Sequence, residues 1–62
     1  MKLKPGTTVV VHPHHQKHRA FLAKILPQGF RKFKVSCFVE DSKGSIVWVE
    51  KNWLSKPKFK HD

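Results

Sequence analysis

Residues 30–40, Phe-Arg-Lys-Phe-Lys-Val-Ser-Cys-Phe-Val-Glu, give the clearest indication of the fold of this chain. Apolar and polar side chains alternate along them, which is the pattern of a strand with one buried face. The predicted buried face holds Phe33, Val35, Cys37 and Val39. The predicted opposite face holds Lys32, Lys34, Ser36, Phe38 and Glu40. We therefore expect a long strand over residues 30–40.

The sequence after this stretch predicts a hairpin. Residues 41–44, Asp-Ser-Lys-Gly, indicate a tight turn, because their glycine can adopt a positive φ. Residues 45–50 then predict a second strand, with Val47 and Val49 on one face and Ile46 and Trp48 on the other. Residues 51–54 predict a short helical turn that places Leu54 in the core.

The sequence before this stretch predicts two more strands. Residues 7–12 are rich in β-branched side chains, which favour a strand, and Pro13 ends it. Residues 13–18 are polar and predict a loop. Residues 19–26 have a composition that leans towards helix, but the segment is short for a helix. We interpret them as a strand with Phe21, Ala23 and Ile25 on one face, followed by a turn at residues 27–29.

Short strands joined by turns predict an all-β fold, a small barrel of four to five short antiparallel strands with a closing helical turn. A chain of 62 residues makes a single domain. We place this domain at residues 5–55, between a flexible basic N-terminus of residues 1–4 and a basic C-terminal tail of residues 56–62.

The order of these elements resembles the SH3-like barrels, and among them, loosely, the Tudor domains. The Pro5-Gly6 turn before three valines resembles the opening of the family, and residues 21–25 resemble its second strand. Residues 39–44 resemble the acidic turn between the third and fourth strands, and residues 47–54 resemble the last strand with its helical turn.

The resemblance implies a cage for a methylated Lys or Arg, which Tudor domains hold by cation–π attraction. Its positions would fall near Phe21, Phe38 and Asp41. Pro13 stands where the family has a further aromatic residue, and the chain contains no Tyr. We therefore do not expect a complete cage.

Charge indicates the kind of partner. The chain has 13 Lys and Arg against 4 Asp and Glu, a formal net charge of +9. Such a domain attracts nucleic acid, an acidic protein surface or an anionic membrane. We predict nucleic-acid binding, DNA or RNA, mainly through phosphates and with weak sequence specificity. The predicted binding residues are Arg19, Lys24, Arg31, Lys32, Lys34 and Lys43, with Phe38 and Trp48 as stacking groups.

Other interpretations of the same residues stay open. The cations could simply be a solvated surface, with Phe38 and Trp48 in the core. The leading alternative is a protein-interaction module that docks on an acidic surface or binds a peptide through an exposed aromatic face. Attachment to anionic lipid is weaker, because no amphipathic helix is predicted. Trp53 is expected to close the core, and less so to anchor a partner.

The sequence predicts neither an enzyme nor a cofactor. Cys37 is expected to be a small buried hydrophobic residue, since no neighbouring base would activate it. One of Glu40 and Asp41 is expected to hold the turn. The residues with metal-binding chemistry are His12, His14, His15 and His18. Their spacing fits no standard zinc site, so we expect an exposed loop. A single cysteine and no signal-like or membrane-spanning apolar run predict an intracellular protein.

Overall fold

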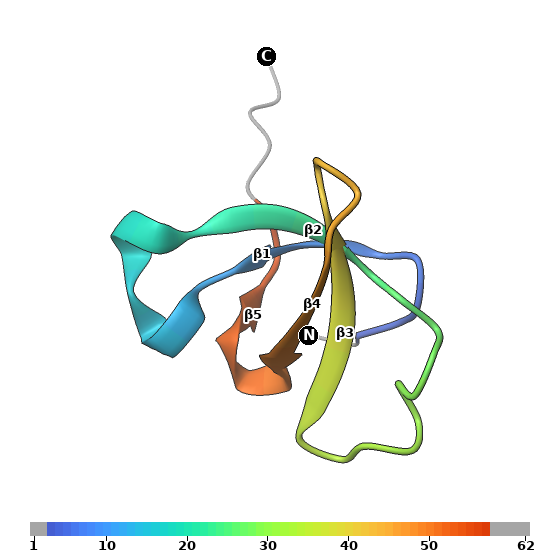
Figure 1. The fold of residues 1–62 in the computed structure, drawn as a ribbon. Helices are drawn as coiled ribbons and strands as arrows, with labels where there is room; N and C mark the ends of the chain where they lie inside the picture. The colour runs from blue at the N-terminus through green and yellow to red at the C-terminus, as the bar shows by residue number, and fades with distance from the viewer. Residues whose placement is uncertain (1–2, 58–62) are drawn as a thin grey trace.

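The structure is a computed structural model that describes residues 3–57, shown as a ribbon in Figure 1. Residues 1, 2 and 58–62, which include most of the predicted basic tail, lie outside the described part. The strands are β1 (Thr8–Val11), β2 (Phe21–Ile25), β3 (Ser36–Asp41), β4 (Ile46–Glu50) and β5 (Leu54–Ser55). Three single 3-10 turns accompany them: η1 (Pro13–His15), η2 (Lys17–Arg19) and η3 (Lys51–Trp53).

The prediction of an all-β fold with antiparallel strands is confirmed. All five strands belong to one sheet in the order β4-β3-β2-β1-β5, and every neighbouring pair is antiparallel. The order ends at β4 and β5, which do not pair with each other. The sheet is therefore open between these two strands.

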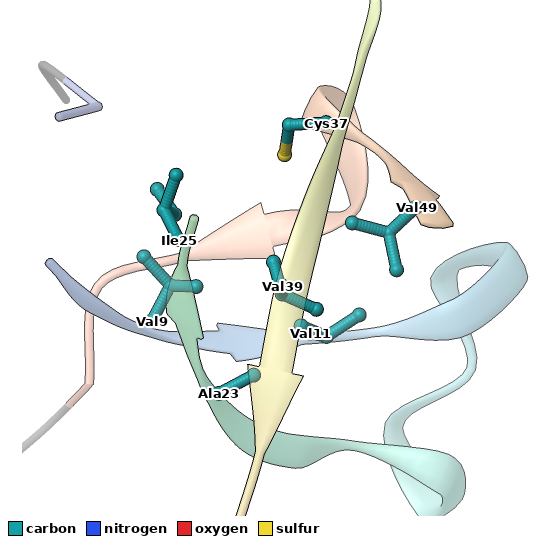
Figure 2. Close-up of a cluster of buried hydrophobic side chains, with 7 residues drawn as sticks. All are labelled: Val9, Val11, Ala23, Ile25, Cys37, Val39 and Val49. Atoms are coloured by element: carbon teal, nitrogen blue, oxygen red, sulfur yellow. The ribbon is translucent and has the colours of Figure 1, made fainter. Parts of the chain in front are cut away.

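The core lies on the inner face of this bent sheet, where side chains from four strands converge (Figure 2). The fully or almost fully buried apolar residues are Val9, Val11, Ala23, Ile25, Cys37, Val39 and Val49. Burying a valine or isoleucine side chain contributes roughly 1.5–3 kcal/mol, so this small cluster is the main source of stability. Leu54 and Trp53 pack against it from the end of the chain, as the sequence predicts for both.

The predicted long strand over residues 30–40 is wrong in its first half. The strand begins at Ser36, and the residues before it form turns, so Val35 is 74% exposed and Phe33 is 38% exposed. The physical reason is Gly29, which adopts φ +73° and reverses the chain. Its carbonyl then accepts hydrogen bonds from the backbone N–H groups of Lys32 and Phe33. Backbone groups satisfied within the turn cannot also join a ladder.

The predicted polar loop over residues 13–18 contains η1 and most of η2. Its backbone is unusual, because His14 and His15 have φ values of 51° and 61°. Residues other than glycine, asparagine and aspartate seldom adopt this left-handed region. The start of the loop is held to η3, since the N–H of His12 donates to the carbonyl of Trp53 at 2.8 Å.

From residue 3 to residue 57, no helix has the length and apolar character needed to cross a bilayer.

Candidate functional site

The surface opposite the core, on β2, β3 and β4, carries exposed aromatic and aliphatic side chains. We call this surface the outer face; it consists of Leu22, Lys24, Phe38, Glu40, Ile46 and Trp48. Phe38 lies directly opposite Trp48 in the register of β3 and β4. Trp48 is 54% exposed, whereas Phe38 is half-buried. The indole therefore presents a large apolar surface to a ligand.

The segment between β2 and β3, residues 27–35, adjoins the outer face, and we call it the 27–35 loop. The ring of Phe33 meets the ring of Phe38 edge-on, with centroids 6.3 Å apart and an angle of 73°. Arg31, Lys32 and Lys34 are exposed in this loop. Contact between the two rings thus brings three cations to the border of the aromatic surface.

Lys51 holds the 27–35 loop in place. Its ammonium donates to the carbonyl of Phe30 at 2.9 Å and to that of Phe33 at 2.8 Å. The same nitrogen lies 4.2 Å from the centroid of the Phe30 ring, within the range of a cation–π contact. Its backbone N–H also donates to the carbonyl of Val35. Sequence reasoning missed this residue, because nothing local links position 51 to a loop some twenty residues earlier.

The predicted face of Lys32, Lys34 and Phe38 on one strand is wrong, because both lysines precede the start of β3. They nevertheless adjoin Phe38, through the contact of Phe33. Lys24 does lie on the outer face, opposite Glu40 in the register of β2 and β3. An acidic group therefore lies beside that cation.

The remaining two predicted cations lie at the other end of β3. Lys43 is in the β3–β4 turn, and Arg19 ends η2 just before β2. The pairing of Ala23 with Asp41 places the middle of β2 at the end of β3, and Phe21 at the start of β2 lines a common hollow with Lys43. Six residues of β3 separate it from the 27–35 loop, roughly 20 Å of extended chain, and Figure 1 shows the two ends well apart. The six predicted cations therefore do not form one patch.

An open hollow lies beside that turn. It has a volume of about 540 Å³ and is lined by Phe21, Leu22, Asp41, Ser42, Lys43 and Val47. Two of the positions implied by the Tudor resemblance, Phe21 and Asp41, therefore share one hollow. The third, Phe38, lies on the opposite face of β3, because successive strand residues alternate in direction. The three residues do not meet as a cage.

Asp41 holds the β3–β4 turn, as predicted for one of the two adjacent carboxylates. Its Oδ1 accepts hydrogen bonds from the backbone N–H groups of Lys43 and Ser45, each at 2.9 Å. The N–H of Gly44 donates to the Asp41 carbonyl at 3.0 Å. Because this oxygen accepts two backbone hydrogen bonds, the carboxylate stabilises the turn.

Two histidines contact residues of η3 and β5. His12 Nε2 lies 2.8 Å from Ser55 Oγ, and the His14 ring lies 4.8 Å from that of Trp53. His15 and His18 are exposed. Among residues 3–57, no three His, Cys, Asp or Glu side chains come close enough together to hold a metal ion.

Cys37 is fully buried on the core face of β3, as its predicted role requires. Burial raises the pKa of its thiol, since the thiolate would be poorly solvated, and the nearby Lys51 ammonium opposes this only in part. A protonated and inaccessible sulfur is a poor nucleophile.

Comparison of the chain with protein-family models, curated protein sequences and solved structures finds no match in any of the three.

Proposed function

We propose that this protein is a small SH3-like barrel domain that binds nucleic acid through its outer face and the 27–35 loop. One observation carries the proposal: an exposed Trp48 is paired across the strands with Phe38, whose ring contacts Phe33 of a loop that carries three exposed cations. The cations would neutralise phosphates, and the indole offers a flat surface for a base. The net charge of +9 would steer the encounter.

The proposed mechanism favours single strands over duplexes. A base can stack on Trp48 only if it is free of its own partner, and such stacking contributes about 1–3 kcal/mol per base. Arg31, Lys32 and Lys34 would follow the backbone, which carries no sequence information. Weak sequence preference and a steep dependence on salt are the expected properties.

A salt-resolved binding assay tests the proposal. Fluorescence anisotropy would follow the protein with labelled single-stranded DNA, duplex DNA and RNA over a range of NaCl concentrations. The double variant Lys32→Ala/Lys34→Ala should bind more weakly, with a salt slope reduced by roughly 1.4 on single strands. The control Lys17→Ala/Lys56→Ala loses the same charge at exposed positions outside the loop. Equal effects of the two double variants, or affinity that does not change with salt, would exclude this site.

A second function is favoured by a different observation. Ile46 is 66% exposed beside Trp48 on the outer face, and Glu40 lies opposite Ile46. An exposed aliphatic and an acidic side chain suit a protein surface better than phosphates. If the ligand is a protein, Trp48→Ala should abolish binding, whereas Lys32→Ala/Lys34→Ala should mainly slow association. Separate measurement of association and dissociation rates distinguishes the two functions.

A further inference from the structure

The free edge of β4 is a second potential binding surface, distinct from the side chains of the outer face. Within residues 3–57, β4 ends the sheet and has only β3 as a hydrogen-bonded neighbour. Two bonds at its ends fix which groups face β3. The N–H of Lys51 donates to the carbonyl of Val35 at 2.8 Å, and the N–H of Asp41 donates to the carbonyl of Ser45 at 3.0 Å.

Both bonds continue the β3–β4 register, in which hydrogen-bonded and non-hydrogen-bonded pairs alternate. The backbone groups of Val47 and Val49 therefore point to β3. Those of Ile46, Trp48 and Glu50 point away from it, along the free edge. Since the side chains of Ile46 and Trp48 are also exposed, an unpaired row of donors and acceptors lies in an accessible position. Such an edge is a template for an added strand.

The surroundings of this edge indicate what would pair with it. The 540 Å³ hollow includes Val47 of β4 together with Phe21 and Lys43, and so adjoins the start of the strand. A second hollow of about 430 Å³ lies at the other end of the strand, lined by Lys34, Val35, Glu50, Lys51 and Asn52. Each end of the edge thus combines apolar side chains with at least one lysine and one carboxylate, Asp41 at the first end and Glu50 at the second.

We propose that the β4 edge binds an extended, acidic segment of a partner protein as an additional strand. Side chains of an added strand alternate in direction, so every second one would turn towards Phe21 and Val47 and should be apolar. The intervening side chains would lie beside Ile46 and Trp48. Acidic residues near the ends of the segment would meet Lys43 and Lys34. The net charge of +9 makes an acidic segment the complementary occupant.

The same charge disfavours a second copy of this chain on the edge. Two molecules of +9 would approach along their longest free strand edge, and like charges repel. Self-association remains an outcome that the experiment would reveal, through a mass that rises with concentration and protection of the edge amides without any added peptide. That outcome would overturn the proposal.

Amide hydrogen exchange measured by NMR tests the edge directly. In the free protein, the amides of Ile46 and Trp48 should exchange quickly, whereas those of Val47 and Val49 should be protected. The probe is a peptide of about eight residues in which glutamate and valine alternate, long enough to span the strand. Its addition should slow exchange at Ile46 and Trp48 by about tenfold or more and change Val47 little. Slow exchange at Ile46 and Trp48 in the free monomer would overturn the proposal.

Two control peptides test the predicted chemistry of the partner. A peptide of the same composition, with glutamates in one block and valines in another, lacks the alternation. A peptide in which lysine replaces glutamate reverses the charge. The proposal requires that the alternating acidic peptide bind at least about tenfold more tightly than either control, a difference of about 1.4 kcal/mol. No binding of the alternating acidic peptide, or equal binding of all three, would overturn it.

A pair of variants isolates the backbone donor. Ile46→Pro removes one edge N–H at the first residue of an edge strand, where proline is tolerated. Ile46→Ala removes the side chain and keeps the N–H. Ile46→Pro should weaken peptide binding by about threefold to tenfold relative to Ile46→Ala. If Ile46→Pro does not fold, a synthetic chain methylated on the backbone amide nitrogen of Trp48 removes the next N–H along the same edge. Equal binding by both variants would contradict the added strand.

This inference does not depend on nucleic-acid binding. Arg31→Ala/Lys32→Ala, which spares the Lys34 that would meet the peptide, should weaken nucleic acid and leave the Ile46 amide equally protected by the peptide. Ile46→Pro should weaken the peptide relative to Ile46→Ala, whereas these two variants, which both lack the isoleucine side chain, should show the same salt slope with single-stranded DNA. Each experiment can therefore fail while the other succeeds.

Discussion

At the scale of single residues, Lys51 and Gly29 determine the shape of the surface that carries the proposed site. Lys51 replaces water around two carbonyl groups of the 27–35 loop. Gly29 permits the reversal of the chain, and the Phe33 ring packs directly over its Cα. Neither residue contacts the ligand in our proposal. Both hold in place the 27–35 loop, which carries the proposed ligand-binding cations.

Replacing Lys51 should therefore loosen the 27–35 loop. Lys51→Met keeps most of the side-chain length but removes two charge-assisted hydrogen bonds and the contact with Phe30. We expect the free energy of unfolding to fall by about 1–3 kcal/mol. The loss is limited to this range because one of the two bonds is exposed to solvent. Urea denaturation measures the change. Lys56→Met, at an exposed position, is the control and should change stability little; an equal effect of both variants would contradict the role of Lys51.

Two glycines with positive φ provide a matched test of the loop. Gly44→Ala meets no atom within 4 Å and should cost only the backbone strain of φ +84°, about 1–2 kcal/mol. Gly29→Ala adds to a similar strain a Cβ 2.7 Å from Phe33 Cε2, so the ring must move. We expect a loss at least about 1 kcal/mol greater for Gly29→Ala, together with altered NMR shifts at Phe38. Equal losses would mean that the ring does not lie over Gly29.

At the scale of elements, β3 has a purely structural face and a face available for function. Cys37 and Val39 point into the core, while Phe38 and Glu40 point outwards. Pairing with β4 adds Trp48 opposite Phe38. The edge position of β4 leaves half of its backbone groups without a neighbouring strand. One hairpin therefore supports both proposed binding surfaces.

A pair of valines tests where β3 begins. Val35 and Val39 occupy equivalent places in the alternating sequence, yet Val35 is 74% exposed and Val39 is fully buried. Val39→Ala should lower the free energy of unfolding by about 2–3 kcal/mol, through lost burial and the cavity left behind. Val35→Ala should change it by no more than about 0.5 kcal/mol. Thermal and urea unfolding would measure both changes in stability. Similar losses of stability in the two variants would support the longer strand predicted over residues 30–40.

At the scale of the whole molecule, the small core and the high charge have to be considered together. In the described part of the chain, residues 3–57, seven apolar residues are buried, and the full chain of 62 residues has a net charge of +9. A domain of this size is marginally stable, and self-repulsion reduces the margin further. Opening of the whole fold should therefore be frequent enough to measure, and the buried thiol of Cys37 reports it.

Cys37 should react with a thiol reagent only when the molecule opens. At pH 8, modification of the folded protein should be far slower than in urea. Burial raises the pKa of this thiol, so the folded state holds the proton more tightly than the unfolded chain. The resulting stability is present below the ordinary thiol pKa of about 8.5 and is lost as pH rises through the folded value. The Cys37→Ala variant should lack this part of the loss of stability at alkaline pH. If the free energy of unfolding depends on pH identically in both proteins, the raised pKa of Cys37 is contradicted.

The sequence by itself determined the all-β class and the approximate places of the strands, and its net charge predicts a negatively charged partner. It did so because these follow from local properties: β-branched runs, alternation after Ser36, turn residues and net charge. The role of Asp41 was also predictable, since its hydrogen bonds span only a few residues.

Only the tertiary structure decided how the predicted site is assembled. The position of the 27–35 loop depends on Lys51, whose partners are 18 and 21 residues away in sequence. The division of the six cations between two ends of β3 depends on the register of β2 with β3. The free edge of β4 depends on which strands end the sheet. Each of these rests on contacts between distant residues, which no local pattern of side chains encodes.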